Sequence, residues 1–479
     1  MNLYANLSIA APEGFLCISA LVLLLVGAIG GPRSSPWISL LSGAALIAAA
    51  VMTATGPLGS AFAGGFIADS TAVFARTAIY GMSAVGVLLG DRWLAARQDA
   101  KFEFPILVML AAVGMGMMAA AGDLISLYVG VELQSLALYV LAAFRRNDAK
   151  ASEAGLKYFV LGALSSGLLL YGASLIYGFA GSTHLADIAA AVHTGAKTGV
   201  LFGLVFLVCG LAFKLSAAPF HMWTPDVYEG APTPVVAFFA AAPKLAAIVL
   251  LARVLIVGFP GAVEQWRQVV MAIAAISMLW GAFAGLAQKN LKRLWAYSSI
   301  ANVGYALVGL SAAGKTGVQS MLMFMVLYMI DVTGFFACLS ALSREGRPME
   351  TMDDMAGLFR QRPGIALAMT AFSLSALGLP PFSGFWAKVY VFKAALGVGT
   401  PSMIGLAILG LVSSVVAAFY YLRLIKVMWF DPSAGETDAL PAYAKGVAYV
   451  AALFSFPVVM IALVALDPLA ATAAVFGLG

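Results

Sequence analysis

Five charged side chains stand inside long apolar stretches of this chain: Glu132, Lys214, Lys244, Asp331 and Lys388. A charged group at the centre of a bilayer costs about 2.5–3.5 kcal/mol on insertion scales, so such residues usually serve a function. Burial penalises the charged form of carboxylates and ammonium groups alike, which lets buried acids and lysines exchange protons near neutral pH. These residue types therefore suggest proton transfer. The alternative is a set of static ion pairs that fix helix packing.

Static pairing does not account for the whole set. Glu132 follows Asp123 by nine residues, about 14 Å along a helix, which places this acid near mid-membrane. Three lysines against one central acid would leave ammonium groups uncompensated. We therefore expect proton exchange within the set.

Prolines interrupt two of these apolar stretches, each beside a lysine. Pro219 follows Lys214 by five residues, and Lys388 follows the Pro380-Pro381 pair by seven. Proline removes a hydrogen-bond donor and clashes with the preceding turn. Backbone groups freed at membrane depth must face protein or water rather than lipid. Each break is therefore predicted to create a polar, hydratable spot near a lysine.

The cysteines and the common nucleotide motifs give no sign of a cofactor. Cys17, Cys209 and Cys338 lie far apart in apolar runs, and the three histidines are also scattered. Cysteine pairs with the spacing of a zinc site or an iron–sulfur cluster are missing, as are a phosphate-binding P-loop and a dinucleotide fingerprint. We predict no metal and no cofactor in this chain, and buried, inert thiols.

The composition places these residues in a membrane. Hydrophobic residues make up 62% of the 479 residues and charged residues 10%, against about 25% charge in a soluble domain. This excludes a soluble enzyme or a disordered chain and predicts an all-α polytopic membrane protein. A span needs about 20 apolar residues, and we locate fourteen spans, at 15–31, 37–56, 70–90, 104–121, 123–144, 156–180, 200–223, 234–257, 268–287, 293–313, 318–342, 364–395, 402–430 and 445–466.

The basic residues predict the orientation. Most of the 27 lysines and arginines fall in alternate loops, such as Arg145 and Arg146 in one and Lys289, Lys292 and Arg293 in another. Loops rich in Lys and Arg stay on the cytoplasmic side, so both termini are expected on the outer (periplasmic) face. The start of the chain has neither the basic stretch nor the cleavage site of a signal peptide, so we expect the first segment to remain a span.

The two proline breaks also suggest an internal repeat. Pro219-Phe220 matches Pro381-Phe382, and an aromatic residue follows three positions later in each. The breaks lie five spans apart, and a duplicated unit with an odd number of helices must insert upside down. We expect an N-terminal three-helix segment (1–103), two inverted five-helix repeats (104–260, spans 4–8, and 261–430, spans 9–13) with discontinuous helices 7 and 12, and a C-terminal helix (431–479).

Four stretches resemble the antiporter-like membrane subunits of NADH–quinone oxidoreductase, respiratory complex I. They are Gly122–Tyr139, Lys157–Leu164, Leu291–Ile300 and the run Phe220-His-Met-Trp-Thr-Pro-Asp-Val-Tyr-Glu-Gly. The Glu132-Leu-Gln-Ser run and the Phe220 run look like the N-type members rather than the L or M types, and the long C-terminal lateral helix of the L type is missing. The resemblance covers nearly the whole chain.

The resemblance implies a proton path and residues for it. Its span-5 glutamate matches Glu132, and its lysines of spans 7, 8 and 12 match Lys214, Lys244 and Lys388. His221 matches a histidine of the family motif, as a path member or a packing residue. Tyr297 and Ser298 are candidate bridging groups. Asp331 is an extra relay, or a partner for a lysine.

One position departs from the family pattern. Asn302 stands where the family often has histidine. An asparagine side chain cannot titrate, so a proton step at span 10 is in doubt, although a water-bridging role survives. Of the candidate acids and bases, Glu132 and Lys214 are expected to form a pair that associates and parts.

The family also implies partners and a division of labour. Expected partners are the other membrane subunits of complex I, especially the M and K subunits, and membrane lipids, with no nucleic acid. NADH, FMN, iron–sulfur clusters and quinone would bind in other subunits, so this chain is a non-redox part of a proton-pumping enzyme of a bacterial plasma membrane. The alternatives are a subunit of a Mrp-type cation/proton antiporter, which shares the fold, and a scaffold that only transmits strain.

Overall fold

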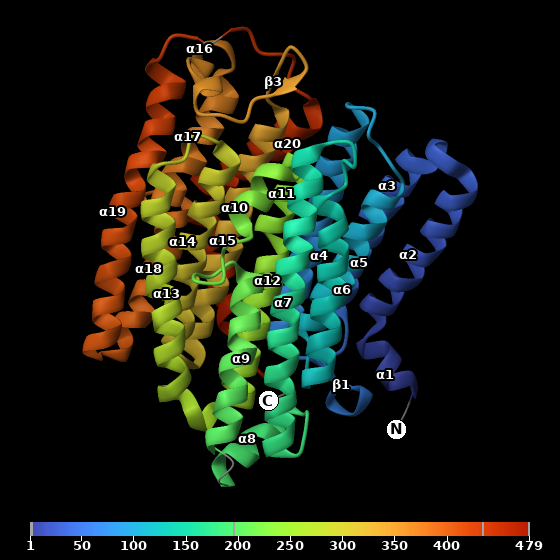
Figure 1. Ribbon diagram of the computed structural model, residues 1–479, viewed down its shortest axis with the longest axis vertical. Helices are drawn as coiled ribbons and strands as arrows, with labels where there is room; N and C mark the ends of the chain where they lie inside the picture. The colour runs from blue at the N-terminus through green and yellow to red at the C-terminus, as the bar shows by residue number, and fades with distance from the viewer. Residues whose placement is uncertain (1–2, 195–196, 434, 478–479) are drawn as a thin grey trace.

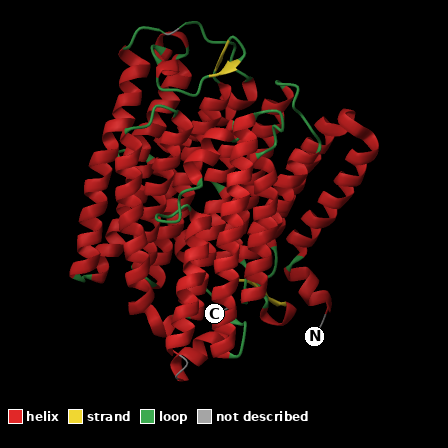
Figure 2. Ribbon diagram, in the orientation of Figure 1, coloured by secondary structure: helices red, strands yellow, loops and turns green. Residues whose placement is uncertain are grey.

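The computed structural model describes residues 3–194, 197–433 and 435–477. Long helices run side by side along most of the height of the molecule (Figure 1), and among these residues strand occurs in two small hairpins at opposite ends (Figure 2). In the described residues, ten helical stretches are long and apolar enough to cross a membrane. The chain is thus a multi-pass helical membrane protein.

The N-terminal part forms one flank of the molecule. It comprises α1 (Leu3–Ile9), α2 (Ala11–Gly30), α3 (Ser35–Thr55), the hairpin of β1 (Gly59–Ala61) and β2 (Phe66–Ala68), and α4 (Ser70–Ala95). Figure 1 shows α2 at the outer edge of the molecule; α2 packs against α3 and α5, α3 packs against α4, and α4 packs against α5, α11 and α12. Much of the α2–α3 surface is exposed and apolar, as in Ile18, Leu21 and Ile29.

The central part holds most of the helices, and their bounds follow in chain order. The first group is α5 (Glu103–Ala119), α6 (Leu124–Ala142), α7 (Ala149–Ala180), α8 (Leu185–Thr194), α9 (Lys197–Leu215), α10 (Thr224–Gly230), α11 (Thr233–Ala240) and α12 (Ala242–Arg253). The second group is α13 (Val263–Leu286), α14 (Leu291–Ser311), α15 (Gly314–Ala341), α16 (Leu358–Gln361), α17 (Pro363–Leu377), α18 (Ser383–Val398) and α19 (Pro401–Phe430).

The C-terminal part returns to the N-terminal flank. The hairpin of β3 (Ser343–Arg344) and β4 (Arg347–Pro348) lies beside the loop that leads into α20 (Ala442–Leu453) and α21 (Val459–Ala473). Thr71 at the start of α4 donates a hydrogen bond to the carbonyl of Ala473. Asp69 accepts two bonds from Arg253, at 2.7 and 2.8 Å, and a third from the backbone N–H of Gly477. These contacts fasten the chain end to α4 and α12.

Small residues let the helices cross closely. A Cβ atom on Gly114 of α5 would lie 2.5 Å from the backbone nitrogen of Gln134 on α6. Gly172 of α7 and Gly203 of α9 approach each other in the same way, since a Cβ on either would come within 3 Å of the other's carbonyl oxygen. In a membrane, where lipid tails are as apolar as leucine, such backbone-to-backbone packing holds helices together.

Every one of the fourteen predicted segments contains helix, but their continuity differs from expectation. The breaks predicted at Pro219 and at Pro380-Pro381 are present, and helix stops at Leu215 rather than at residue 223. Two further breaks were not predicted: one between α11 and α12 at Ala241, and one where a π-helical turn at Phe454–Val458 separates α20 from α21. Pro243 and Pro457 lie at these two positions.

Candidate functional site

Glu132 and Lys214 are brought near each other on α6 and α9 but do not touch. Asp123 caps α6, because its carboxylate accepts the backbone N–H of Ser126 at 2.6 Å. Two turns further along, half-buried Glu132 accepts a hydrogen bond from the hydroxyl of Ser166 on α7. The ammonium of Lys214 instead donates to Ser135, one turn after Glu132, at 2.7 Å. The predicted pair is thus parted, because the Lys214 ammonium binds Ser135 instead of Glu132.

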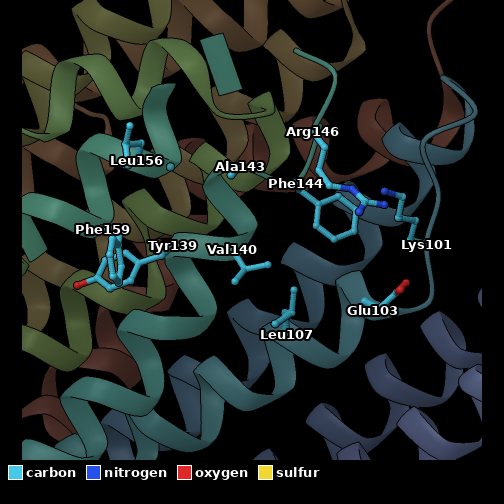
Figure 3. Close-up of a pocket in the computed structure, with 11 residues that line it drawn as sticks. Lys101, Glu103, Leu107, Tyr139, Val140, Ala143, Phe144, Arg146, Leu156 and Phe159 are labelled. Carbon is cyan, nitrogen blue, oxygen red and sulfur yellow. The ribbon is translucent and has the colours of Figure 1, made fainter. Parts of the chain in front are cut away.

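A cleft reaches Tyr139, which is a hydrogen-bond partner of Lys214. It has a volume of about 550 Å³ and lies among α5, α6 and α7. Figure 3 shows Tyr139 beside Phe159 at one end and Arg146 beside Lys101 at the other. The hydroxyl of Tyr139 also accepts a longer hydrogen bond, 3.3 Å, from Lys214. Tyr139 therefore stands between the cleft and the buried lysine.

Lys244 sits at the unpredicted break of α11 and α12. Ala241 leaves helical geometry (φ −107°, ψ −94°), Pro243 follows, and Lys244 lies in the first turn of α12 with 1% of its surface exposed. Its ammonium donates to Ser299 of α14 at 2.5 Å, and the hydroxyl of Tyr328 on α15 donates to the same oxygen at 2.6 Å. Ser299 thereby joins Lys244 to Tyr328.

Lys388 lies at the second predicted break. Helix α17 ends at Leu377, and Gly378 turns the chain through a left-handed conformation (φ 91°) that glycine adopts without strain. The ammonium of Lys388 donates to the freed carbonyls of Ala376 at 3.1 Å and Leu377 at 2.8 Å. A cation at a helix C-terminus is favourable, because the last carbonyls lack partners and the helix dipole is negative there.

Lys388 has a third partner and a cavity beside it. It donates to the hydroxyl of Ser414 on α19 at 2.9 Å, and that hydroxyl lies 2.8 Å from the Tyr305 hydroxyl. Lys388, Tyr328, Asn302 and Asp331 also line a small cavity of about 10 Å³. This is about the space that one water molecule needs. Lys244, Ser299 and Tyr328 form a hydrogen-bonded series, and the cavity places its last member, Tyr328, beside Lys388.

The three lysines share one electrostatic feature. Within residues 3–194, 197–433 and 435–477, no carboxylate lies within ion-pair distance of Lys214, Lys244 or Lys388. Their partners are hydroxyls and backbone carbonyls. Such partners hold an ammonium group without neutralising it, so each lysine can lose and regain a proton without breaking an ion pair. The arrangement is chemically suited to proton transfer rather than to static charge pairing.

Several other charged groups of the protein form ion pairs, in contrast to these three lysines. On the side of the molecule that bears β3, Asp226 of α10 accepts hydrogen bonds from Lys157 of α7 at 2.7 Å and from Arg293 of α14 at 2.6 Å. In the N-terminal part, buried Arg76 makes two bonds to Glu13, at 2.7 and 2.6 Å. These pairs tie helices together, as the static alternative describes.

Three of the predicted residues lie outside the hydrogen-bonded series of Lys244, Ser299 and Tyr328. His221 is half-buried beside Trp280, with ring centres 5.6 Å apart, and the Trp280 ring is largely exposed at the molecular surface. Ser298 hydrogen-bonds the hydroxyl of Tyr421 at 2.5 Å instead of a lysine. Tyr297 is half-buried, and in the described residues no hydrogen bond joins its hydroxyl to Lys214, Lys244 or Lys388. Asn302 donates to the carbonyl of Ser298 at 2.9 Å and lines the cavity beside Lys388.

Sequence reasoning missed Ser135, Ser299 and Tyr328. Two signals were available: Ser135 follows Glu132 by one helical turn, and Pro243 directly precedes Lys244. Tyr328 carried no such signal, because only the packing of α15 against α14 brings its hydroxyl to Ser299. Two gaps remain in the hydrogen bonding of the described part of the chain: no hydrogen bond joins Lys214 to Lys244, and none joins Tyr328 to Lys388. The same residues contain no group of three His, Cys, Asp or Glu side chains that could hold a metal.

Comparison with known proteins gives consistent similarities. Residues 121–416 match the family model described as NADH:quinone oxidoreductase/Mrp antiporter, TM. A curated protein of a Caulobacter species named NADH-quinone oxidoreductase subunit N is 73% identical over 392 residues, 81% of each chain. A protein of the same name from Maricaulis maris is 54% identical over 91% of each chain.

Solved structures agree on the fold. A chain in respiratory complex I from Thermus thermophilus with bound aureothin superposes with a TM-score of 0.81 at 33% identity, covering 96% of this chain and 99% of the other. A chain of the Mrp complex from Dietzia sp. superposes with a TM-score of 0.83 at 22% identity, covering 97% and 96%, which shows likeness of fold alone.

Proposed function

Because the chain belongs to the family of NADH-quinone oxidoreductase subunit N, an antiporter-like membrane subunit of respiratory complex I, we propose that it moves protons across the membrane through Glu132, Lys214, Lys244 and Lys388. The observation that carries this proposal is the placement of the lysines. Each of the three lies close to a helix break and bonds to hydroxyls or carbonyls, and in the described residues none has a carboxylate partner.

The first step uses the parted pair. If Glu132 turned from Ser166 toward Lys214, the two charges would attract by about 4 kcal/mol at 4 Å and an effective dielectric of 20. This is about a thousandfold preference for the protonated lysine, since about 1.4 kcal/mol corresponds to a factor of ten. When the pair parts again, as in the geometry described, Lys214 loses that preference and its proton can leave toward Lys244. Water is proposed to bridge this interval.

The second step uses the hydroxyl series. The relay requires the hydrogen bond between Ser299 and Tyr328 to reverse, because Tyr328 donates to Ser299 in the geometry described. Once Ser299 donates to Tyr328, Lys244 passes a proton to the oxygen of Ser299 while Ser299 passes its own to Tyr328, and Tyr328 releases its own to water in the cavity. The hydrogen bonds of 2.5 and 2.6 Å on Ser299 support this relay. The water then protonates neutral Lys388. No net charge is left on a hydroxyl, because each receives one proton as it gives one away.

We propose the finer architecture on the same footing: fourteen spans, with residues 104–260 and 261–430 as inverted five-helix repeats between the segments 1–103 and 431–479. Corresponding helices pair alike, which supports this division. Helix α5 packs on α6 as α13 packs on α14, and α7 packs on α9 as α15 packs on α17. The two breaks used by Lys214 and Lys388 fall at corresponding places.

The proposed orientation puts both termini on the outer face. Figure 1 places α1 at the same end of the molecule as the end of the chain, and the β3 hairpin at the other end. That other end carries Arg344, Arg347 and Arg360, in keeping with a cytoplasmic surface. The exposed apolar faces of α2, α3 and α6 are then covered by lipid and neighbouring membrane subunits, of which we propose the M and K subunits.

The chain takes part in a proton-pumping NADH:quinone oxidoreductase. Electron transfer is proposed to occur in other subunits, where NADH, FMN, iron–sulfur clusters and quinone bind. Identity of 73% to a protein named subunit N favours this assignment over a Mrp antiporter subunit. A scaffold that only transmits strain is the remaining alternative, and it makes a different prediction for the lysines.

The test is Lys244→Ala in the intact complex, with NADH-driven proton pumping and quinone reduction measured together in membrane vesicles. We expect an assembled complex, checked on a native gel, whose pumping is lost or nearly lost. Exposed Lys315→Ala is the matched control and should pump normally. Normal pumping by both variants would leave Lys244 a structural residue and favour the scaffold.

A further inference from the structure

Asp331 lies where three helix ends meet. It is on α15, has 4% of its surface exposed, and is surrounded by serines from the end of α17 (Ser375), the start of α18 (Ser383) and the π-helical turn between α20 and α21 (Ser455). One carboxylate oxygen, Oδ2, accepts hydrogen bonds from Ser375 at 2.5 Å and Ser383 at 2.7 Å. The Ser383 hydroxyl in turn lies 2.9 Å from that of Ser455. Two hydroxyl donors on one oxygen stabilise an ionised carboxylate.

The other oxygen of Asp331 has no such support. Oδ1 is buried and has no hydrogen-bond partner in the described part of the chain. Buried polar atoms are rarely left unpaired, so an orphaned one points to a water or ion that completes the site. Asp331 lines the one-water cavity, and so does Lys388. A single water there can bond to Oδ1 and lie beside the lysine.

The surroundings leave Lys388 as the charge that faces Asp331. Among the residues that line the cavity, the titratable groups besides Asp331 are Lys388 of α18 and Tyr328 of α15. Helix α14 contributes Asn302 and Trp295, and α17 contributes Ser375. The turn between α20 and α21 contributes Ser455, which hydrogen-bonds the Ser383 hydroxyl beside Asp331. A water at this point is thus shared between one acid and one base.

We propose that Asp331 and Lys388 exchange a proton through this water. The ammonium of Lys388 gives a proton to the water as the water gives one to Oδ1 of Asp331, which turns an ammonium and a carboxylate into an amine and a carboxylic acid. The reverse step restores both charges. No net charge appears or disappears, so the exchange avoids leaving a lone charge in a dry interior. This inference rests on the proposed function and adds an acid to its second half.

The exchange also explains how Lys388 can be emptied. In the hydroxyl series it receives protons by way of Tyr328, yet nothing in that series takes them onward. Asp331 supplies an acceptor across one water. Sodium is the other cation that a carboxylate among hydroxyls could hold, but a second cation in the same cavity would be repelled by the Lys388 ammonium.

The experiment uses the intact complex in membrane vesicles with three variants. Asp331→Asn keeps the shape and removes the charge, Asp331→Glu keeps the charge, and Thr333→Val alters a buried polar residue of the same helix as a control. Positioned acid–base groups contribute about 10²- to 10⁴-fold to a proton-transfer step. We expect Asp331→Asn to assemble and pump about tenfold less or worse. Asp331→Glu should retain much of the activity, and Thr333→Val should pump normally.

An infrared difference spectrum separates a relay from an anchor. Turnover should protonate Asp331, so the wild-type complex should show a carboxylic acid C=O band that Asp331→Asn lacks and Thr333→Val keeps. Normal pumping by Asp331→Asn, or an unchanged spectrum, would overturn the proposal. So would pumping that requires sodium in the wild type but not in Asp331→Asn.

Lys388→Ala distinguishes a failure of this inference from a failure of the proposed function. If Lys388→Ala stops pumping while Asp331→Asn pumps normally, the inference fails and the proposed function stands. If Lys388→Ala also pumps normally, both fail. Exposed Lys393→Ala, on the same helix as Lys388, is the matched control.

Discussion

Two adjacent serines on α14 give the sharpest test of the proposed path. Ser299 accepts a hydrogen bond from the buried ammonium of Lys244 at 2.5 Å and a second from Tyr328 at 2.6 Å. Its neighbour Ser298 points elsewhere, to the hydroxyl of Tyr421. Both serines are fully buried, so alanine removes one hydroxyl from a similar environment at either position. We predict that Ser299→Ala impairs proton pumping and that Ser298→Ala leaves it close to normal.

The magnitude follows from the partners of Lys244. Ser299 is the one hydrogen-bond partner found for its ammonium in the described residues, and Lys244 has 1% of its surface exposed. A hydrogen bond to a charged group contributes about 1.5–3 kcal/mol. Losing it disfavours the ammonium form about 10- to 100-fold. The variant also breaks the series between Lys244 and Tyr328, so pumping should fall about tenfold or more.

The assay measures proton uptake into inverted membrane vesicles on addition of NADH, together with quinone reduction and the amount of assembled complex. Ser299→Thr keeps the hydroxyl and should restore a substantial part of the activity. Dividing pumping by the amount of assembled complex removes any effect on stability. This normalisation matters because a buried cavity or an orphaned Tyr328 hydroxyl could lower the yield of Ser299→Ala.

One outcome would refute the reasoning. If both alanine variants assemble and Ser298→Ala pumps as poorly as Ser299→Ala, or worse, the hydrogen bonds of Ser299 do not form the path. Equal, normal pumping by both would show that protons bypass α14 altogether. The relay from Lys244 to Lys388 would then have to be abandoned in either case.

Three further predictions concern other parts of the molecule. Glu132→Gln should abolish most pumping in an assembled complex, whereas Glu13→Gln, which loses a static pair with Arg76, should lower the yield of complex instead. A native gel and the pumping assay separate the two effects, and the opposite pattern would contradict the assignment. Gly378→Ala should reduce pumping, because the backbone conformation at φ 91° costs alanine about 1–2 kcal/mol of conformational free energy and its Cβ would lie 2.9 Å from Cδ of Lys388. Unchanged pumping would mean that Lys388 needs no fixed position. Hydrogen bonds from Ser343 and from the backbone N–H groups of Gly346 and Glu345 lower the pKa of Asp438. The bonds between its carboxylate and the β3 hairpin should therefore be present above the ordinary aspartate pKa of about 3.9 and be lost as the pH falls through the lowered pKa. Proteolysis of the loop at 431–441 should be faster in Asp438→Asn than in wild type at neutral pH, and equal rates would argue against this anchor.

Much of the fold could be predicted from composition and hydropathy. All fourteen predicted segments contain helix, since a bilayer requires long apolar stretches whose backbone is internally bonded. The breaks at Pro219 and Pro380-Pro381 could also be predicted, because proline acts locally on the turn that precedes it. The break before Lys244 was missed although Pro243 marks it, because a proline in the first turn of a helix is normally harmless.

The candidate site was likewise predictable only in part from the sequence. The four titratable residues could be named from sequence, because a charge inside an apolar stretch is visible wherever the chain folds. Their connections could not. Ser298 and Ser299 are neighbours in sequence, and 100° of rotation per residue on α14 decides which one faces Lys244.

The sequence by itself determined that the chain crosses a membrane many times, that it belongs among antiporter-like subunits, and that Glu132, Lys214, Lys244 and Lys388 are titratable groups within apolar stretches. These properties depend on composition and local pattern. Only the tertiary structure decided that Ser299 and Tyr328 join Lys244 to the Lys388 cavity and that Asp331 faces this cavity. Hydrogen bonds act over about 3 Å, so the rotation and depth of each helix against its neighbours select the partners, and neither is written in any one helix alone.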